Sequence, residues 1–423
     1  MIAETGGQNA LIVDSSALPE QVIADALTSA FDSAGQRCSA LRVLCLQEEI
    51  ASDLTARLKS AMGELKLGPP DRLSVDVGPV ISAEACNSLV AYIERMRRRG
   101  FAIFATPLGA DCARGFFIAP TLIEINAVAD LGGEVFGPVL HVLRYRREAL
   151  PTLLDALNAT GFGLTGGVHS RLDSTVDLVS ARLSAGNIYV NRNIIGATVG
   201  VQPFGGHGLS GTGPKAGGPL YLKRLLATAP ASWPSLPAGE PSPTARRFAD
   251  FIAARGEGEL AKLCAKLAEQ SRCGASVELP GPTGERNVYS LAPRGAVLCD
   301  AASEEALIVQ IACALATGNR AWLSGAPAAR LIAALPGELR DVIALAAPNE
   351  NVDAALTDRE GDALIALLAE YARRDGPITP VFRLSADGLR GGDVAPLDFL
   401  VKERSLCVNT AAAGGNASLM TIG

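Results

Sequence analysis

Apolar residues follow two alternating patterns in the first part of the chain. Leu11-Ile12-Val13 is a short apolar run before a polar stretch, which predicts a buried strand. From residue 19 to residue 31 the apolar positions recur at helical spacing, with Pro19 suited to the first turn and Gly35 to the stop. Residues 40–46 form a second apolar run, typical of a buried strand. These alternations predict an α/β fold.

The same alternation returns later in the chain. Residues 226–244 are rich in Pro, Ala and Ser, which is typical of a linker, and residues 246–269 then follow helical spacing. Residues 295–299, 305–316 and 320–323 are predicted to form a strand, a helix and a strand. This βαβ pattern predicts a small parallel sheet. The turn after its first strand lacks glycines, so we do not expect a phosphate-binding loop there.

Composition narrows the class of protein. The 423 residues are enough for two ordinary domains, and a net charge of −6 gives no bias towards nucleic acid. We find neither a signal-peptide pattern nor an apolar stretch long enough to cross a membrane. The nine cysteines form no Cys-x-x-Cys pair and there are only three histidines, so no metal site is expected. We therefore expect a reduced, cytoplasmic protein.

Two residues near the start of the chain are candidates for chemistry. Cys38 lies on a glycine-marked turn after a predicted helix, where a sulfur can be exposed and nearby amides can favour the thiolate. Glu4 could act as the base that deprotonates an attacking water. Cysteine is also among the most buried residue types, and a charged residue near a terminus is usually just solvated. From the residues alone, a buried structural role for Cys38 and a merely solvated Glu4 are also compatible with the sequence.

The sequence around both candidates resembles the aldehyde dehydrogenase superfamily. Phe31-x-x-x-Gly-Gln-x-Cys38 is similar to the family's nucleophile segment, and Glu4-x-Gly-Gly to its base segment. Gln8 departs from the lysine that many members carry after the two glycines. Glu134-Val-Phe136-Gly-Pro resembles the family's cofactor motif, which implies that Glu134 and Phe136 contact the nicotinamide ribose of NAD.

A narrower resemblance comes from residues 191–204 and 210–219, which are similar to the glutamate semialdehyde dehydrogenase module of bacterial proline utilisation A proteins. It implies that Ser39, Gly196 and Ala197 bind the substrate carboxylate. The same resemblance implies that Phe204 forms a wall of the substrate tunnel. The nearby Gly206-x-Gly208-x-x-Gly211 matches a dinucleotide fingerprint by spacing, but neither the expected strand nor helix surrounds it. We therefore reject that interpretation.

The resemblance covers essentially the whole chain and predicts four regions. The first is an aldehyde dehydrogenase catalytic domain, a parallel sheet with flanking helices, and a Rossmann-like α/β domain follows it after the linker. In the longer members of the family a final tail docks over the dehydrogenase site. The predicted ranges are 1–225 for the catalytic region, 226–244 for the linker, 245–402 for the Rossmann-like domain and 403–423 for the tail.

The resemblance also implies missing parts. The family's cofactor domain lies N-terminal to the glutamate motif, as does an FAD-dependent proline dehydrogenase region. We therefore expect a C-terminal fragment or split-gene product that is inactive alone and needs its N-terminal half, with homodimerisation left open. The predicted function is NAD-dependent oxidation of glutamate γ-semialdehyde through a cysteine thioester. The alternatives are a non-catalytic assembly or regulatory fragment, a split-gene remnant, or another semialdehyde dehydrogenase.

Overall fold

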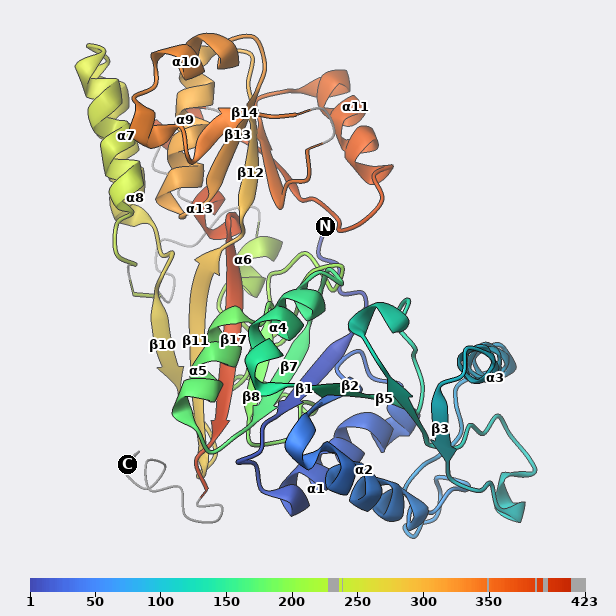
Figure 1. Ribbon diagram of the computed structural model, residues 1–423. Helices are drawn as coiled ribbons and strands as arrows, with labels where there is room; N and C mark the ends of the chain where they lie inside the picture. The colour runs from blue at the N-terminus through green and yellow to red at the C-terminus, as the bar shows by residue number, and fades with distance from the viewer. Residues whose placement is uncertain (227–235, 238, 348–349, 385, 391–394, 412–423) are drawn as a thin grey trace. The chain divides into compact units, whose positions relative to one another are not determined.

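The computed structural model describes residues 1–226, 236–237, 239–347, 350–384, 386–390 and 395–411. The chain divides into two compact units that interleave along the sequence (Figure 1). The first unit contains Glu4–Gly211, Leu279–Asn287 and Ser405–Gly423, and the second contains Met1–Ala3, Thr212–Glu278 and Val288–Arg404. All the predicted site residues fall in the first unit.

The first unit is built on a mainly parallel sheet in the order β17-β8-β7-β1-β2-β5-β4-β3, with β11 beside β17. Its last pair, β3 and β4, is antiparallel. Every residue of β1 and β2 is buried, as expected for central strands covered on both faces. The strands are β1 (Asn9–Val13), β2 (Leu41–Gln47), β3 (Ala102–Ala105), β4 (Thr121–Ile125), β5 (Val139–Tyr145), β7 (Thr165–His169) and β8 (Asn187–Val190), with a separate small pair β6 (Phe162–Gly163) and β9 (His207–Gly208). Of β11 (Glu285–Pro293) and β17 (Val401–Asn409), only residues 285–287 and 405–409 belong to this unit.

Helices cover this sheet. Helices α1 and α2 pack together, and both contact β2 and β5 (Figure 1). Helix α1 spans the predicted residues, and β2 begins one residue after the predicted strand. The segment between α1 and β2 therefore carries Cys38 on the turn that the sequence predicts. The helices are α1 (Pro19–Phe31), α2 (Glu48–Gly63), α3 (Ala83–Arg98), α4 (Leu150–Asn158) and α5 (Asp173–Arg182), with 3₁₀ turns at Asp32–Gly35, Ala110–Cys112, Val128–Asp130 and Arg147–Ala149.

The second unit contains a five-stranded parallel sheet in the order β14-β13-β12-β15-β16. Two strands follow the first strand on one side and two on the other, which is the doubly wound order of a Rossmann-like fold. The predicted βαβ unit is confirmed, since α9 connects β12 to β13. The strands are β12 (Ala296–Asp300), β13 (Arg320–Ser324), β14 (Ile343–Leu345), β15 (Ala354–Thr357) and β16 (Val381–Arg383), and β10 (Ser276–Leu279) precedes them.

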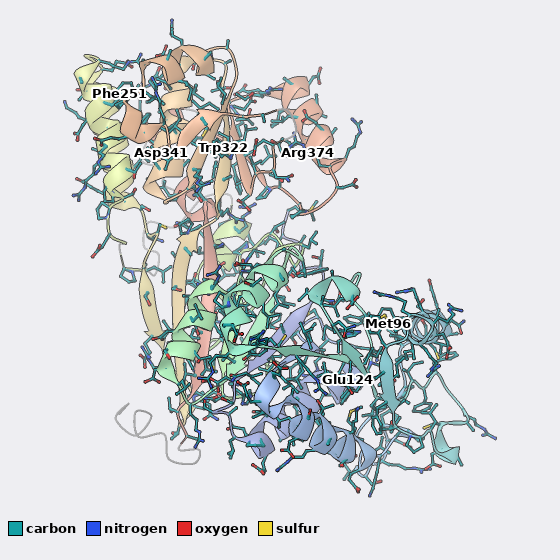
Figure 2. The ribbon with its side chains drawn as sticks, in the orientation of Figure 1. Met96, Glu124, Phe251, Trp322, Asp341 and Arg374 are labelled. Atoms are coloured by element: carbon teal, nitrogen blue, oxygen red, sulfur yellow. The ribbon has the colours of Figure 1, made fainter. Side chains whose placement is uncertain are left out.

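Helices of the second unit pack around α9, which is almost entirely buried. The helical pattern predicted over 246–269 is divided between two helices, because Gly256 takes a left-handed conformation with a φ of 87° and separates α7 from α8. Phe251 on α7 and Trp322 on β13 are labelled in Figure 2. The helices are α6 (Tyr221–Leu225), α7 (Pro243–Ala254), α8 (Gly258–Gln270), α9 (Glu304–Ala316), α10 (Ala328–Ala334), α11 (Gly361–Ala372), α12 (Ala386–Arg390) and α13 (Ala395–Phe399), with a 3₁₀ turn at Gly337–Leu339.

The α/β class and the large parallel sheet are confirmed. The predicted domain ranges stay predictions. Most of the predicted linker and residues 412–423 of the predicted tail lie outside the described residues, whereas residues 403–409 of that tail belong to β17. No helix in the described ranges combines the length and apolar character that a membrane crossing requires.

Candidate active site

An unusual turn presents Cys38. After α1, the residues Ser33, Ala34 and Gly35 all have left-handed backbone conformations, with φ values of 56°, 53° and 64°. Left-handed conformations are costly for residues other than glycine and persist where the surroundings fix them. Gly35 is required for a second reason, because a Cβ at this position would lie 2.2 Å from the carbonyl oxygen of Gly137. The turn leaves Cys38 half-buried, three residues before β2 begins at Leu41.

A buried asparagine fixes the backbone that follows the cysteine side chain. The Nδ2 atom of Asn9 donates to the carbonyl oxygens of Cys38 and Ala40, at 2.7 and 2.8 Å. Its Oδ1 atom accepts from the Thr165 N–H at 3.1 Å. The carbonyl of Ser39 in turn accepts from the Thr165 hydroxyl at 3.2 Å. Asn9 on β1 and Thr165 on β7 thus fix the end of the turn over residues 33–38, which carries the predicted nucleophile and is called the nucleophile turn below.

The charges around Cys38 oppose ionisation of its thiol. Burial raises the pKa of Cys38 most, and the carboxylates of Glu4 and Glu134 raise it further. The backbone N–H groups of Cys38 and Ser39 act in the opposite direction, because they favour the thiolate. Glu4 lies in the first unit, where it forms an isolated antiparallel bridge with Gly211. The structure therefore brings Cys38, Glu4 and Glu134 close enough for the two carboxylates to affect the thiol.

Glu134 lies against the segment that follows Glu4. Its Oε1 atom accepts from the Gly7 N–H at 3.1 Å, and a Cβ at Gly6 would come within 2.2 Å of Oε2. Burial raises the pKa of Glu134, while the Gly7 N–H and the positive charge of Arg42 lower it. Phe136, two residues later, keeps 46% of its surface exposed. A half-buried carboxylate beside an exposed aromatic ring is a suitable surface for a sugar with free hydroxyls.

For the residues predicted to contact the substrate, the structure gives burial and backbone conformation. Ser39 is buried, Ala197 and Phe204 are half-buried, and Gly196 is exposed with a φ of 73°. This loop is tied to α1 because the Ile194 N–H donates to the Ser29 hydroxyl at 3.1 Å. The roles of Ser39, Gly196, Ala197 and Phe204 stay predictions.

A polar cluster that the sequence analysis did not identify fixes the far side of that loop. Gln202 accepts from the Thr198 N–H at 3.1 Å and donates to Glu285 and Asn287. Its amide nitrogen also lies 3.2 Å from the Cys407 sulfur. Glutamine in a glycine-rich loop carries no sequence signal for this role, because Glu285 and Asn287 lie more than 80 residues away in the chain.

The rejected dinucleotide fingerprint has a different structural role. Gly208 has a φ of 64°, and a Cβ there would lie 2.3 Å from the carbonyl oxygen of Gly161. It belongs to β9, which pairs antiparallel with β6. The glycine permits a close backbone approach.

In the second unit, charged side chains occupy the position where a doubly wound sheet usually binds ligands. At the carboxyl ends of β12 and β15, Asp300 lies 2.7 Å from the Arg359 guanidinium and accepts from the Thr357 hydroxyl. Glu304 and Glu305 lie in the first turn of α9. Carboxylates at a helix N-terminus compete with any phosphate for its positive end.

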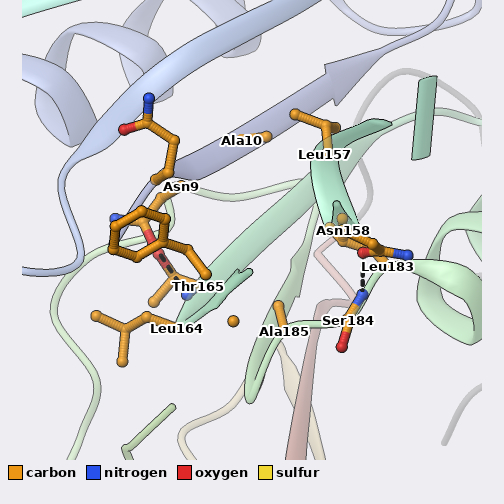
Figure 3. A pocket seen from close by; sticks show the side chains of 12 residues that line it. Asn9, Ala10, Leu157, Asn158, Leu164, Thr165, Leu183, Ser184 and Ala185 are labelled. Carbon is orange, nitrogen blue, oxygen red and sulfur yellow. Dashed lines mark hydrogen bonds between the residues drawn. The ribbon is translucent and has the colours of Figure 1, made fainter. Parts of the chain in front are cut away.

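A small cavity lies beside Asn9 and Thr165 (Figure 3). On its far side, the Ser184 N–H donates to Asn158 Oδ1 at 2.7 Å. The cavity has room for about one water molecule, so it is too small for a substrate. Among the described residues, no group of three His, Cys, Asp or Glu side chains is placed to hold a metal ion.

Comparisons with known proteins agree with this geometry. The model of the aldehyde dehydrogenase family matches residues 1–229. The Bifunctional protein PutA of Escherichia coli (strain K12) is 49% identical over 446 residues, covering 100% of this chain and 33% of the relative. The 1-pyrroline-5-carboxylate dehydrogenase of Geobacillus kaustophilus is 37% identical over 225 residues, covering 52% of this chain and 43% of the relative. The chain thus spans about a third of the length of the PutA relatives.

Solved structures extend the comparison. A crystal structure of a bifunctional proline utilization A (PutA) protein is 55% identical with a TM-score of 0.51, covering 53% of this chain and 22% of that one. The structure of PutA from Corynebacterium freiburgense is 27% identical with a TM-score of 0.71, covering 96% of this chain and 39% of that one. The similarity to this second structure therefore includes both units.

Proposed function

This chain belongs to the aldehyde dehydrogenase family, and from that membership we propose that it carries the catalytic and substrate-binding part of an NAD-dependent dehydrogenase that oxidises L-glutamate γ-semialdehyde to glutamate in proline catabolism. The observation that carries the substrate assignment is the similarity along the whole chain to proteins named Bifunctional protein PutA. Relatives named 1-pyrroline-5-carboxylate dehydrogenase support it over half of the chain. Their named substrate is the cyclic form of the same semialdehyde.

The proposed reaction uses Cys38 and Glu4. The Cys38 thiolate attacks the aldehyde carbon and forms a hemithioacetal, whose oxyanion needs preorganised donors. After oxidation to the thioester, Glu4 takes a proton from the water that attacks it. The products are glutamate and the free Cys38 thiol. The negative charge of Glu4 raises the pKa of Cys38, and this interaction between the two groups supports the pairing.

The residues present fit the nicotinamide end of NAD. Glu134 offers a half-buried carboxylate held by the Gly7 N–H, and Phe136 offers an exposed ring. When bound, NAD would accept the hydride that leaves the hemithioacetal, with its ribose against these two residues. The family is generally NAD-dependent, and for this chain the preference for NAD is part of the proposal.

The carboxylate of the semialdehyde would be held by Ser39, Gly196 and Ala197, with Phe204 as a wall of the tunnel. A hydroxyl and backbone N–H groups can bind a carboxylate without an added cation. The left-handed Gly196 and the open space around it support an approach of the ligand to the backbone here. The half-buried Phe204 is compatible with a wall.

The wider setting is also proposed. Because the PutA relatives are about three times as long as their match to this chain, we infer that the chain acts together with a further region of that kind of protein. All nine cysteines are free, which supports a reducing, cytoplasmic compartment. A non-catalytic role and another semialdehyde substrate are the alternatives that experiment has to separate.

Protection of Cys38 from alkylation tests the proposal on the purified chain. Iodoacetamide labelling of the Cys38 peptide is followed by mass spectrometry in the presence of glutamate γ-semialdehyde or succinate semialdehyde. We expect glutamate γ-semialdehyde to protect Cys38 at lower concentration, and the Cys264 peptide to serve as the buried internal control. Stronger protection by succinate semialdehyde would overturn the substrate assignment. Lack of protection by either aldehyde would favour a non-catalytic role.

A further inference from the structure

A fully buried arginine lies beneath the candidate active site. Arg42 on β2 has no exposed surface and is among the largest completely buried side chains in the described chain. A charge in such a position is costly unless hydrogen bonds and opposite charges compensate it. Burial lowers the pKa of Arg42 to about 10, so it still carries its charge at neutral pH. The aldehyde dehydrogenase motifs discussed above do not assign it a role.

The guanidinium joins two segments of the site. Its Nη1 atom donates to the carbonyl oxygens of Gly35 and Gly137, at 2.8 and 3.1 Å, and its Nη2 atom donates to that of Arg37 at 3.1 Å. The first and third carbonyls belong to the nucleophile turn and the second to the cofactor motif. Because the backbones of Gly35 and Gly137 lie close together, the single Arg42 side chain can donate hydrogen bonds to both of their carbonyl oxygens.

The same guanidinium faces the cofactor motif's functional side chains. Nη2 lies 3.8 Å from Glu134 Oε1, and the guanidinium carbon lies 5.2 Å from the centre of the Phe136 ring. Its positive charge also interacts with Cys38. The Nε atom has no hydrogen-bond partner within the described residues, so Arg42 is held by its terminal nitrogens.

A second layer fixes the backbone of Arg42. The His141 ring lies 2.9 Å from the Arg42 carbonyl oxygen through Nδ1, and 2.7 Å from the Tyr92 hydroxyl through Nε2. All these groups are buried, and burial lowers the pKa of His141 to about 4. His141 is therefore neutral at physiological pH and adds no competing charge.

We propose that Arg42 is a positioning residue that couples the nucleophile turn to Glu134, fixing both segments and supplying the positive charge that balances Glu134 beside the Cys38 sulfur. Three elements present titratable groups to that sulfur: the N-terminal segment presents Glu4, the cofactor motif presents Glu134, and β2 presents Arg42. Two carboxylates oppose the thiolate and one cation favours it. The importance of Arg42 for turnover rests on the proposed function, but its effect on the thiol does not.

The pH dependence of Cys38 alkylation by iodoacetamide tests the coupling on the intact chain. We expect Arg42→Met to move the midpoint of alkylation upward by roughly one pH unit and to slow the reaction at neutral pH about tenfold. Arg42→Lys keeps the charge, so most of the midpoint should be recovered. Arg294→Met is the control, because Arg294 is a half-buried arginine in the second unit that also donates to two backbone carbonyls. It should leave the midpoint unchanged.

Glu134→Gln extends the test and replaces it if Arg42→Met fails to fold. Removing this negative charge should lower the midpoint in the wild-type background. A folded Arg42→Met protein with an unchanged midpoint would overturn the proposal, as would a Glu134→Gln protein with an unchanged midpoint. Aldehyde protection of wild-type Cys38 reports on the proposed function separately.

Discussion

The side-chain amide of Asn9 lies 2.7 Å from the carbonyl oxygen of Cys38 and donates a hydrogen bond to it, which fixes the backbone of the proposed nucleophile. Asn9 precedes Cys38 by 29 residues and belongs to the neighbouring strand. Because its other amide hydrogen and its oxygen are also bonded, the three contacts specify one orientation of the nucleophile turn.

Replacing Asn9 by alanine should destabilise the first unit. The change leaves two buried carbonyls and the Thr165 N–H without their partner, which should cost about 2 kcal/mol or more. Urea denaturation followed by circular dichroism measures this loss. Asn126→Ala, at an exposed position, is the control and should change stability by less than about 0.5 kcal/mol. Equal stability of the two variants would contradict the inferred role of Asn9.

Glu4 should be needed to hydrolyse an acylated Cys38. With p-nitrophenyl acetate, Cys38 can be acylated without any cofactor, so the wild-type chain should release p-nitrophenol steadily. Glu4→Gln should give a burst followed by turnover that is about 100-fold slower, because the attacking water lacks its base. Mass spectrometry should then find the acetyl group on Cys38.

Two variants control this experiment. Cys38→Ser should abolish the burst, and Glu64→Gln, which alters an exposed carboxylate, should behave as the wild type. Steady turnover by Glu4→Gln at the wild-type rate would remove Glu4 from the proposed mechanism.

Gly35→Ala should be much more damaging than alanine at another left-handed glycine. At Gly35 the new Cβ would lie 2.2 Å from the Gly137 carbonyl oxygen, in addition to the strain of a positive φ. We expect a loss of about 3 kcal/mol or failure to fold. Gly100 has a φ of 86° with open space around it, so Gly100→Ala should cost only about 1 kcal/mol. Thermal unfolding of both variants measures the difference, and similar losses would show that the close approach is not restrictive.

Two buried histidines should make the fold sensitive to acid. Burial lowers the pKa of both His141 and His169 to about 4, from an ordinary value of 6.5. Since the unfolded chain binds protons at these sites more readily than the folded one, stability should fall as the pH decreases from about 6.5 towards 4. Urea midpoints measured across this range should show the loss.

Asp25, the neighbour of His169, makes the stability of the fold depend on pH in the opposite direction. Asp25 lies 3.3 Å from His169, and burial raises the pKa of this aspartate to about 6 from 3.8. Its contribution to stability therefore decreases as the pH rises through the same window. His141→Gln removes one of the acid-sensitive groups and leaves this pair intact, so its stability should depend less on pH than that of the wild type. An unchanged dependence would contradict burial of a neutral His141.

The sequence was most informative where local patterns decide the structure. Helical spacing predicted α1 over its full length, and the glycine-marked turn placed Cys38 correctly. The motifs around Cys38, Glu4 and Glu134 identified three residues whose charges the fold brings together. Local spacing did not show the break at Gly256, because the residues on both sides of this glycine keep helical periodicity.

The supporting residues could not be predicted because their partners are distant in sequence. Arg42 looks like an interruption of an apolar strand until Gly137, 95 residues away, is placed beside it. The role of Gln202 likewise becomes visible only when Glu285 and Asn287, to which it donates hydrogen bonds, are placed beside it. For Ser39, Gly196, Ala197 and Phe204 the fold gives positions, and their roles still depend on the resemblance.

The position of β17 has a consequence for how the protein is made. Residues 405–408 form the parallel neighbour of β8, and Asn409 donates to the carbonyl of Asn191, 218 residues earlier in the chain. At a synthesis rate of about 5–20 residues per second, β8 would wait roughly 10–40 s on the ribosome for its partner. During this interval one edge of the nascent sheet is open, and an open edge readily pairs with another chain. Chaperone binding is therefore expected to matter most between translation of β8 and translation of β17.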